Sequence, residues 1–542
     1  MPKGSAPLSP PSTTTGPALP ARKVPVSTTM TRASPTPTDA TAPTSTAATP
    51  RPRPLHLGPD PVAIPPPAPS PVPVVDQLGD PSAPTGTIFS GTINMANTIL
   101  GSGMLAMPYA ISSVGLALGL VLVLVSGLAA AFGLWLLTHV ARHLAGSDRA
   151  RGPRTPSSFF ALSTITYPTA AVYFDAAIAI KCFGVATSYL IVIGDLMPEV
   201  VRGLLSLDNN NILVWRSFWI LVSSLPIVPL SFAHRLDSLR HTSMVALCAV
   251  VYLVGMVIYF FAQPDFNVTP GEIVAVRLSL DFFKTLPIFV FAFTCHQNIL
   301  AVYNELGDNA QSQVNVVISS ACSAALIVYY IIGVLGYLQF GDGVAGNIIT
   351  MYPVTPVVTF GRLALAILFV FSYPIQAHPC RTSLTKVLLH VSGPQPPESD
   401  TPTERSPLLP TSPSYASVEQ DDPRPTGHAS HSTQTIPVPT VPARRWWFAD
   451  ASAIHVALTT GIVILSYSIA LVVQSLDTVL AVVGATGSTT ICYILPGVFY
   501  YKIYERKPWT WVKCGAVGMA VTGCVIMACC LTMQAVMHAQ GE

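Results

Sequence analysis

The chain has 542 residues, of which half are hydrophobic and only 10% are charged, with a formal net charge of +2 at pH 7. Soluble globular proteins carry about 25% charged residues, so this composition excludes an ordinary soluble protein and predicts one that crosses a membrane several times. The near-neutral charge gives no indication of a nucleic-acid partner. The ten cysteines fall in or beside apolar runs without the paired spacing of a zinc site, so we expect neither a metal cluster nor a disulfide framework.

The first 85 residues are rich in Pro, Ser, Thr and Ala and contain almost no large apolar side chains. Such a segment buries too little surface to offset the entropy of ordering, so we predict a disordered cytosolic tail over residues 1–85. No charged stretch followed by a short apolar run is present there, and we therefore expect no cleavable signal peptide.

The first apolar stretch, Thr92 to Ala110, contains an interruption: residues 97–103 read NTILGSG, and Pro108 follows. Two glycines and a proline make a poor continuous helix. Within a bilayer, a broken backbone is tolerated only where protein or a watery cavity surrounds it. We therefore predict that this break forms a binding site. The alternative is a face of small residues, Gly101 and Gly103, that packs closely on another helix.

About eleven apolar segments have the roughly 20 residues that a bilayer core requires. They lie at about 88–111, 115–139, 171–197, 212–232, 243–263, 281–302, 314–338, 355–378, 451–474, 477–500 and 509–536. A polar insertion separates the last three segments from the others. The predicted regions are transmembrane helices over 86–391 and 444–537, a disordered cytosolic loop over 392–443 and a short far-side tail over 538–542.

Basic residues gather in alternate loops, which by the positive-inside rule face the cytosol. These loops follow the second, fourth, eighth and tenth segments. The pattern places the N-terminus in the cytosol and the C-terminus on the opposite, far side of the membrane. The sequon Asn267-Val268-Thr269, a candidate glycosylation site at Asn267, falls in a far-side loop and agrees with this orientation.

The sixth segment is interrupted as well. Residues 293–298, FTCHQN, place polar side chains after Pro287 within an apolar run. Interruptions at matching places five segments apart predict two five-helix halves with inverted topology and a ligand site between them. The helix ends at a break suit a zwitterionic amino acid, because free N–H groups bind its carboxylate and free carbonyl groups bind its ammonium.

Four stretches carry a family resemblance: Asn97–Pro108; Ile180–Leu190 with Gly194–Pro198; Phe291–Asn298 with Asn304–Leu306; and Tyr373–Pro374 with His378–Arg381. Together they resemble the amino acid/auxin permease superfamily, and within it the sodium-coupled neutral amino acid transporters and the fungal vacuolar amino acid transporters. The resemblance covers about 85–535 except the insertion. It implies an all-α polytopic membrane protein like the bacterial leucine transporter, with a 5+5 inverted repeat, discontinuous helices one and six, and an eleventh helix outside.

The resemblance also implies binding residues, since backbone groups of both breaks meet the substrate in such relatives. Carried over, the substrate-binding residues are Thr98, Ile99, Leu100, Gly101, Ser102, Gly103, Phe293, Thr294, Cys295, His296 and Gln297. Sodium-coupled relatives hold sodium between the first and eighth helices, which matches Asn97 and Ser372 here. Vacuolar members are often linked to protons instead, so the resemblance implies Na⁺ or H⁺ as the coupling ion and no other cofactor or metal.

Two ionisable side chains inside the predicted helices are candidates for function, because such groups are costly in a membrane. Lys181, in the third segment, is a candidate for ion coupling or for neutralising a buried dipole or carboxylate. Its alternative role is to fix packing by pairing with a carbonyl. His296, in the break of the sixth segment, is a candidate for proton transfer, or else a satisfied polar residue at a helix end.

The insertion contains candidate sorting signals. Glu404, Leu408 and Leu409 fit the acidic dileucine pattern that clathrin-type adaptors read, and Tyr415 begins a tyrosine-based pattern. Both patterns lie in the predicted cytosolic loop, where adaptors are present. They favour a vacuolar or lysosome-like membrane over the plasma membrane.

The sequence therefore predicts a secondary active transporter that moves small amino acids by alternating access, as a symporter or antiporter. The alternative is an amino acid sensor with a transporter-like fold and little flux. Because we find no nucleophile, acid–base pair or phosphate-binding loop, we expect no enzyme.

Overall fold

The computed structural model describes residues 86–148, 158–205, 210–233, 242–263, 269–306, 311–391 and 451–540. Within these ranges the chain forms helices and no strands. The predicted glycosylation site Asn267 and the sorting-signal residues Glu404, Leu408 and Leu409 lie outside the described residues, so both remain predictions.

The first and sixth membrane segments are each formed by two helices. The first consists of α1 (Ile88–Ile99) and α2 (Gly103–Val114), and the sixth consists of α9 (Asp281–Ala292) and α10 (His296–Glu305). We call residues 100–102 and 293–295 the two breaks. Both fall where the sequence predicts them.

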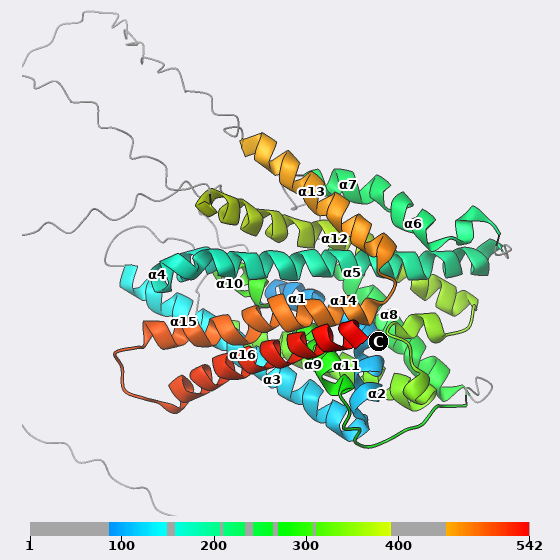
Figure 1. The fold of residues 1–542 in the computed structure, drawn as a ribbon, viewed down its shortest axis with the longest axis horizontal. Helices are drawn as coiled ribbons and strands as arrows, with labels where there is room; N and C mark the ends of the chain where they lie inside the picture. Colours follow the sequence, from blue (N-terminus) through cyan, green and yellow to red (C-terminus); the bar gives the residue numbers. More distant parts are fainter. Residues whose placement is uncertain are drawn as a thin grey trace, which may run out of the picture. The chain divides into compact units, whose positions relative to one another are not determined.

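The other helices follow in chain order (Figure 1). They are α3 (Leu116–Asp148), the short α4 (Phe159–Thr166), α5 (Ala171–Leu205), α6 (Arg216–Val222), α7 (Ser224–Phe232), α8 (Thr242–Ala262), α11 (Gln311–Phe340), α12 (Pro356–Val391), α13 (Ala451–Val472), α14 (Leu476–Val483), α15 (Leu495–Ile503) and α16 (Trp511–Gln540). Two π-helical turns, η6 (Gly484–Ser488) and η7 (Thr490–Ile494), join α14 to α15.

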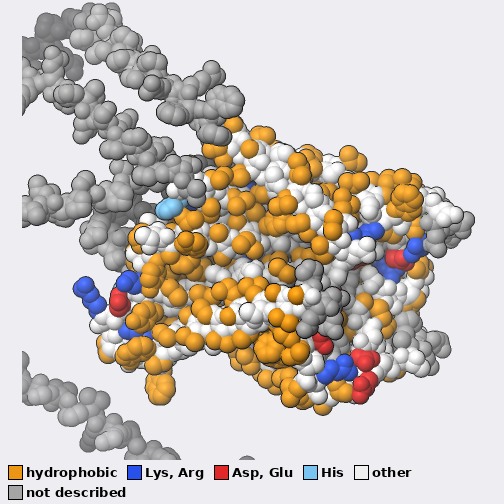
Figure 2. All heavy atoms as spheres, in the orientation of Figure 1, with side chains coloured by type: hydrophobic (Ala, Val, Ile, Leu, Met, Phe, Trp, Pro, Cys, Tyr) orange, Lys and Arg blue, Asp and Glu red, His pale blue; other side chains and the backbone are white. Residues whose placement is uncertain are grey.

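The described helices account for every predicted membrane segment. Eight helical stretches are long and apolar enough to cross a bilayer, and three shorter apolar helices accompany them. Hydrophobic side chains cover most of the face seen in Figure 2, and charged side chains gather toward the helix ends. Lipid requires this distribution. The predicted fold class, an all-α polytopic membrane protein with discontinuous first and sixth helices, is confirmed.

Two long helices frame the breaks. α5 packs along α12, and it also contacts α13 and α14, so it runs through the middle of the bundle (Figure 1). α11 packs on α1, α2 and α3. Side chains from α5 and α11 therefore reach the breaks from two directions.

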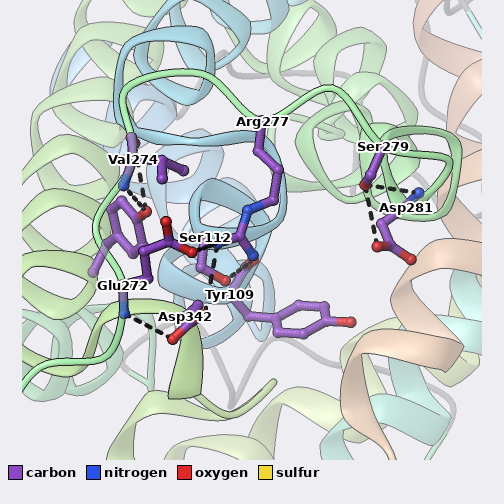
Figure 3. A network of polar contacts seen from close by, with 9 residues as sticks. Tyr109, Ser112, Glu272, Val274, Arg277, Ser279, Asp281 and Asp342 are labelled. Carbon is purple, nitrogen blue, oxygen red and sulfur yellow. Dashed lines mark hydrogen bonds and ion pairs between the residues drawn. The ribbon is translucent and has the colours of Figure 1, made fainter.

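An extended segment before α9, residues 271–277, lies across the end of the bundle where α2 meets α3, and we call it the strap (Figure 3). Its carbonyls at Val274 and Ala275 accept hydrogen bonds from Leu116 N and Ala117 N, at 2.9 and 2.8 Å. These are the first N–H groups of α3, which have no partner within the helix. Gly115 permits this contact, because its φ is +87° and a Cβ there would lie 2.8 Å from Ala275 O.

The strap is also fastened to the end of α11. Val274 N donates to the Tyr337 hydroxyl at 2.9 Å. The Arg277 guanidinium lies 3.4 Å from a Glu272 carboxylate oxygen and 3.6 Å from one of Asp342 (Figure 3). Backbone hydrogen bonds to α3, the Tyr337 hydroxyl and the Arg277–Asp342 ion pair thus hold the strap in place, and the Arg277–Glu272 pair lies within it.

Candidate functional site at the two helix breaks

The C-terminal ends of α1 and α9 meet at one side chain. The Tyr329 hydroxyl of α11 lies 2.7 Å from Ile99 O and 2.6 Å from Ala292 O. Each of these is the last residue of its helix and carries the negative end of the helix dipole. Ile99 O also accepts a backbone hydrogen bond from Gly101 N at 2.8 Å. A hydroxyl has a single proton and donates to one carbonyl at a time. Tyr329 is fully buried, so it links the two breaks in the protein interior.

The N-terminal ends that continue from the breaks are not capped by side chains. Ser102 precedes α2 and Cys295 precedes α10, and neither forms a capping side-chain hydrogen bond. The Ser102 hydroxyl instead pairs with the hydroxyl of Ser188 on α5, at 2.8 Å. The positive ends of both helices therefore suit an anion.

A side-chain bridge lies beside these ends. The Asn298 amide donates to the Thr98 hydroxyl at 2.9 Å, and that hydroxyl donates to Asn94 O. This bridge joins the last turn of α1 to the first turn of α10. Together with Tyr329, it holds four helix ends around one small volume.

That volume is a cavity with room for about one water molecule. It is lined by Thr98, Ile99, Gly101, Ser102, Lys181, Val185, Tyr189, Phe291 and Thr294. Six of these residues were predicted from the sequence. An amino acid is much larger than a water, so the surrounding groups must move apart to admit one.

Three residues of the lining were missed by the sequence prediction. Val185 and Tyr189 lie one and two turns after Lys181 on α5, so helical spacing from Lys181 would have found them. Phe291 lies just before the break that was identified. The sequence also gave no reason to select Tyr329, which is one of several tyrosines in apolar runs.

Several predicted substrate-binding residues do not line the cavity and instead pack among the residues around it. Leu100 and Cys295 are buried, and Phe293 packs its ring edge-on against Tyr329 with centroids 5.0 Å apart. Gly103 allows α2 to approach α9, since a Cβ there would lie 3.1 Å from Ala292 Cα.

His296 belongs to a buried polar cluster with the π-helical turn η7. Its Nδ1 lies 3.2 Å from the Cys492 sulfur, and that sulfur also lies 3.1 Å from the Thr294 hydroxyl. The Gln297 amide, one residue along, makes no hydrogen bond within the described part of the chain. Thr294 and His296 thus contact Cys492, which connects the second break to the tenth membrane segment.

The π-helical turns bring the tenth segment close to Lys181. A Cβ at Gly487 would lie 2.8 Å from the Lys181 backbone nitrogen, so η6 packs directly against α5. π-helical turns occur often at functional sites. The small and polar residues from 484 to 490, GATGSTT, were a signal for this irregular helix that the sequence prediction did not use.

The predicted sodium ligands, Asn97 on α1 and Ser372 on α12, are both partly buried. Neither side chain lines the cavity. The structure does not test whether they hold an ion, and the sodium site remains a prediction.

Comparison with known proteins identifies the family. Residues 84–537 match the family described as "Transmembrane amino acid transporter protein". The chain belongs to this family. It is 36% identical to "Vacuolar amino acid transporter 5" of Schizosaccharomyces pombe, over 82% of this chain and 93% of the relative. It is 35% identical to "Vacuolar amino acid transporter 6" of Saccharomyces cerevisiae, over 82% of this chain and 98% of the relative.

More distant similarities extend beyond fungi. The mouse "Sodium-coupled neutral amino acid transporter 7" is 28% identical over 60% of this chain and 70% of its own. A crystal structure of MhsT in complex with L-phenylalanine aligns with a TM-score of 0.49 at 9% identity, over 83% of this chain and 98% of that one.

Membership of the family confirms the superfamily resemblance and the prediction of amino acid transport rather than enzymatic activity. The vacuolar relatives and the many apolar helices also confirm a multi-pass protein of a vacuolar or lysosome-like membrane.

Proposed function

We propose that this transporter moves small amino acids by alternating access, as a secondary active transporter driven by a proton or sodium gradient. One observation carries the proposal: two interrupted helices place their uncapped ends around a single buried cavity. In membrane transporters, such breaks are where substrates and coupling ions bind.

The helix ends supply a binding mode common to all amino acids. The substrate carboxylate would lie at the N-terminal ends of α2 and α10, and its ammonium would lie near Ile99 O and Ala292 O. There the ammonium would replace the Tyr329 hydroxyl as hydrogen-bond donor. Because the cavity admits about one water, the half-helices must separate on binding, and that movement would open the site to one side of the membrane.

Two ion-coupling schemes are open to this arrangement. Asn97 and Ser372 would hold sodium, and the mouse relative named for sodium coupling supports this scheme. Lys181 and His296 would carry a proton, and their complete burial beside the break supports that scheme. Each scheme makes uptake depend on a different gradient.

The decisive experiment uses the full-length protein reconstituted in liposomes. Uptake of the twenty labelled L-amino acids is measured with and without a sodium gradient and with and without a pH gradient. We expect uptake of at least one amino acid that depends on one of the two gradients. Binding without gradient-dependent uptake would contradict the proposal and support the sensor alternative.

A further inference from the structure

In the part of the chain that the structure describes, almost every buried charged side chain has a polar or charged partner. Among the described residues, the buried charged side chains are Asp175, Lys181, Arg362, Arg381 and Lys513. Three of them donate to backbone carbonyls: Arg362, Arg381 and Lys513. The carboxylate of Asp175 faces the Lys386 ammonium at 4.0 Å. Such compensation is the rule, because a buried charge without a partner is strongly unfavourable.

Lys181 is the exception. It is only 2% exposed, yet in the described part of the chain its ammonium forms no hydrogen bond and no ion pair. The ionisable groups that face it are the thiols of Cys182, Cys295 and Cys492, together with His296, and none of these is a carboxylate. Without a counter-charge a buried lysine favours its neutral amine form, and an anionic ligand in the cavity would supply the partner that stabilises its ammonium form.

The position of Lys181 matches the helix end that binds anions. It lines the same small cavity as Gly101 and Ser102, which directly precede the N-terminus of α2. One carboxylate placed in this volume would meet both the positive end of α2 and the lysine ammonium. The lining contains no acidic side chain that could compensate a second cation.

We propose that Lys181 is the counter-charge for the substrate carboxylate, and that it makes the site select amino acids with neutral or acidic side chains. This inference rests on the proposed transport function and defines its substrate class. A cationic side chain would meet the Lys181 ammonium in a water-poor cavity with no acidic group nearby. L-lysine and L-arginine are therefore excluded.

The first test needs no variant. Uptake of the twenty labelled L-amino acids into liposomes that contain the wild-type chain should exclude L-lysine and L-arginine. The best substrate should also compete at least about tenfold better than its carboxamide derivative, because the amide lacks the charge that Lys181 binds. Uptake of L-lysine or L-arginine at a rate comparable to the best substrate would overturn the inference, and so would equal competition by the amide.

The second test changes the charge. Lys181→Met should raise the KM of the best substrate at least about tenfold and reduce the preference for the carboxylate over the amide. Lys181→Arg should keep the preference, because it keeps the charge. Lys502→Met is the matched control: it removes an exposed lysine of α15 that pairs with Glu505 away from the cavity, and it should leave both the KM and the preference unchanged.

The outcomes separate this inference from the proposed function. If the wild type takes up none of the twenty amino acids, the transport proposal fails. If the wild type transports but Lys181→Met keeps its KM and its preference, only the role of Lys181 is overturned. If Lys181→Met does not fold, the amide competition in the wild type and the preference of Lys181→Arg decide the question.

Discussion

The strap and the two breaks both contain helix ends that need partners, but they find these partners differently. At the strap, each of the first two N–H groups of α3 bonds to its own backbone carbonyl, at Val274 and Ala275. At the breaks, Ile99 O and Ala292 O share the single hydroxyl of Tyr329. The partners at the strap are backbone groups fixed by the chain. At the breaks Ile99 O has one such backbone partner, Gly101 N, but the donor that Ile99 O and Ala292 O share is a side chain that can turn away.

The charged side chains of the strap and of the breaks differ in the same way. Arg277 of the strap is about one-third exposed and faces two carboxylates (Figure 3), whereas Lys181 at the breaks is buried and faces none. Exposed pairs of this kind contribute little free energy, and a buried lone charge is strongly unfavourable. The comparison distinguishes the strap, where the polar groups have fixed partners, from the breaks, where we propose that a ligand supplies a partner.

The largest expected effect comes from filling the contact between the breaks. Gly103→Val would place side-chain atoms against the Ala292 backbone, where a Cβ alone would already be 3.1 Å from Cα. We expect uptake in liposomes to be abolished. Gly255→Val on α8 is the matched control, since a Cβ there meets nothing within 4 Å. Normal transport by the Gly103 variant would remove this contact from the mechanism.

A smaller effect is expected where the strap crosses the turn before α3. Gly115→Ala puts a side chain at a φ of +87°, against Ala275 O at 2.8 Å, and should lower the stability by about 1–3 kcal/mol. The melting temperature of the detergent-solubilised protein would report this loss. Gly343→Ala nearby has open space around its Cβ and should melt like the wild type. Equal melting of the two variants would refute the structural role of Gly115.

Tyr329→Phe tests whether the ligand replaces the hydroxyl. The variant leaves Ile99 O and Ala292 O without a side-chain donor, a change worth about 1–3 kcal/mol. We expect a lower melting temperature than the wild type without amino acid and a larger upward shift when a transported amino acid is added.

The control for this variant is the same change on the same helix. Tyr337→Phe removes the hydroxyl that receives the strap's Val274 N. A transported amino acid should raise its melting temperature only as much as it raises that of the wild type. Equal ligand-induced shifts in melting temperature for the Tyr329 and Tyr337 variants would contradict the proposal that the ligand replaces a hydroxyl at the breaks and not at the strap.

The smallest effect is expected from Arg277→Gln, which removes both ion pairs of the strap. Because these pairs are partly exposed, the stability should fall by at most about 1 kcal/mol and the KM should not change. The melting-temperature difference from the wild type should shrink further in high salt, since salt screens exposed charges. A raised KM would show that the strap contributes to substrate binding.

Much of the fold could be predicted because bilayer-spanning helices are read from local composition. Length and hydropathy located all eleven segments, and Gly101, Gly103 and Pro287 marked the interrupted ones. Lys181 stood out because charge is rare in an apolar helix. These signals lie within single segments and need no knowledge of what packs against what.

Other features depend on neighbours distant in sequence. Tyr329 lies 230 residues from Ile99 and 37 from Ala292, and only the packing of α11 brings its hydroxyl between their carbonyls. The cluster of His296 with Cys492 likewise joins residues 196 positions apart.

By itself, the sequence determined a multi-helix membrane protein with two broken helices, a buried lysine and a family resemblance, since each depends on local composition or on contiguous motifs. Only the tertiary structure decided which helix ends share a partner, which predicted residues line the cavity, and that Lys181 faces it without a counter-charge. Those facts follow from packing, which places residues of α1, α5 and α9 around one small cavity and the Tyr329 hydroxyl of α11 between two helix ends.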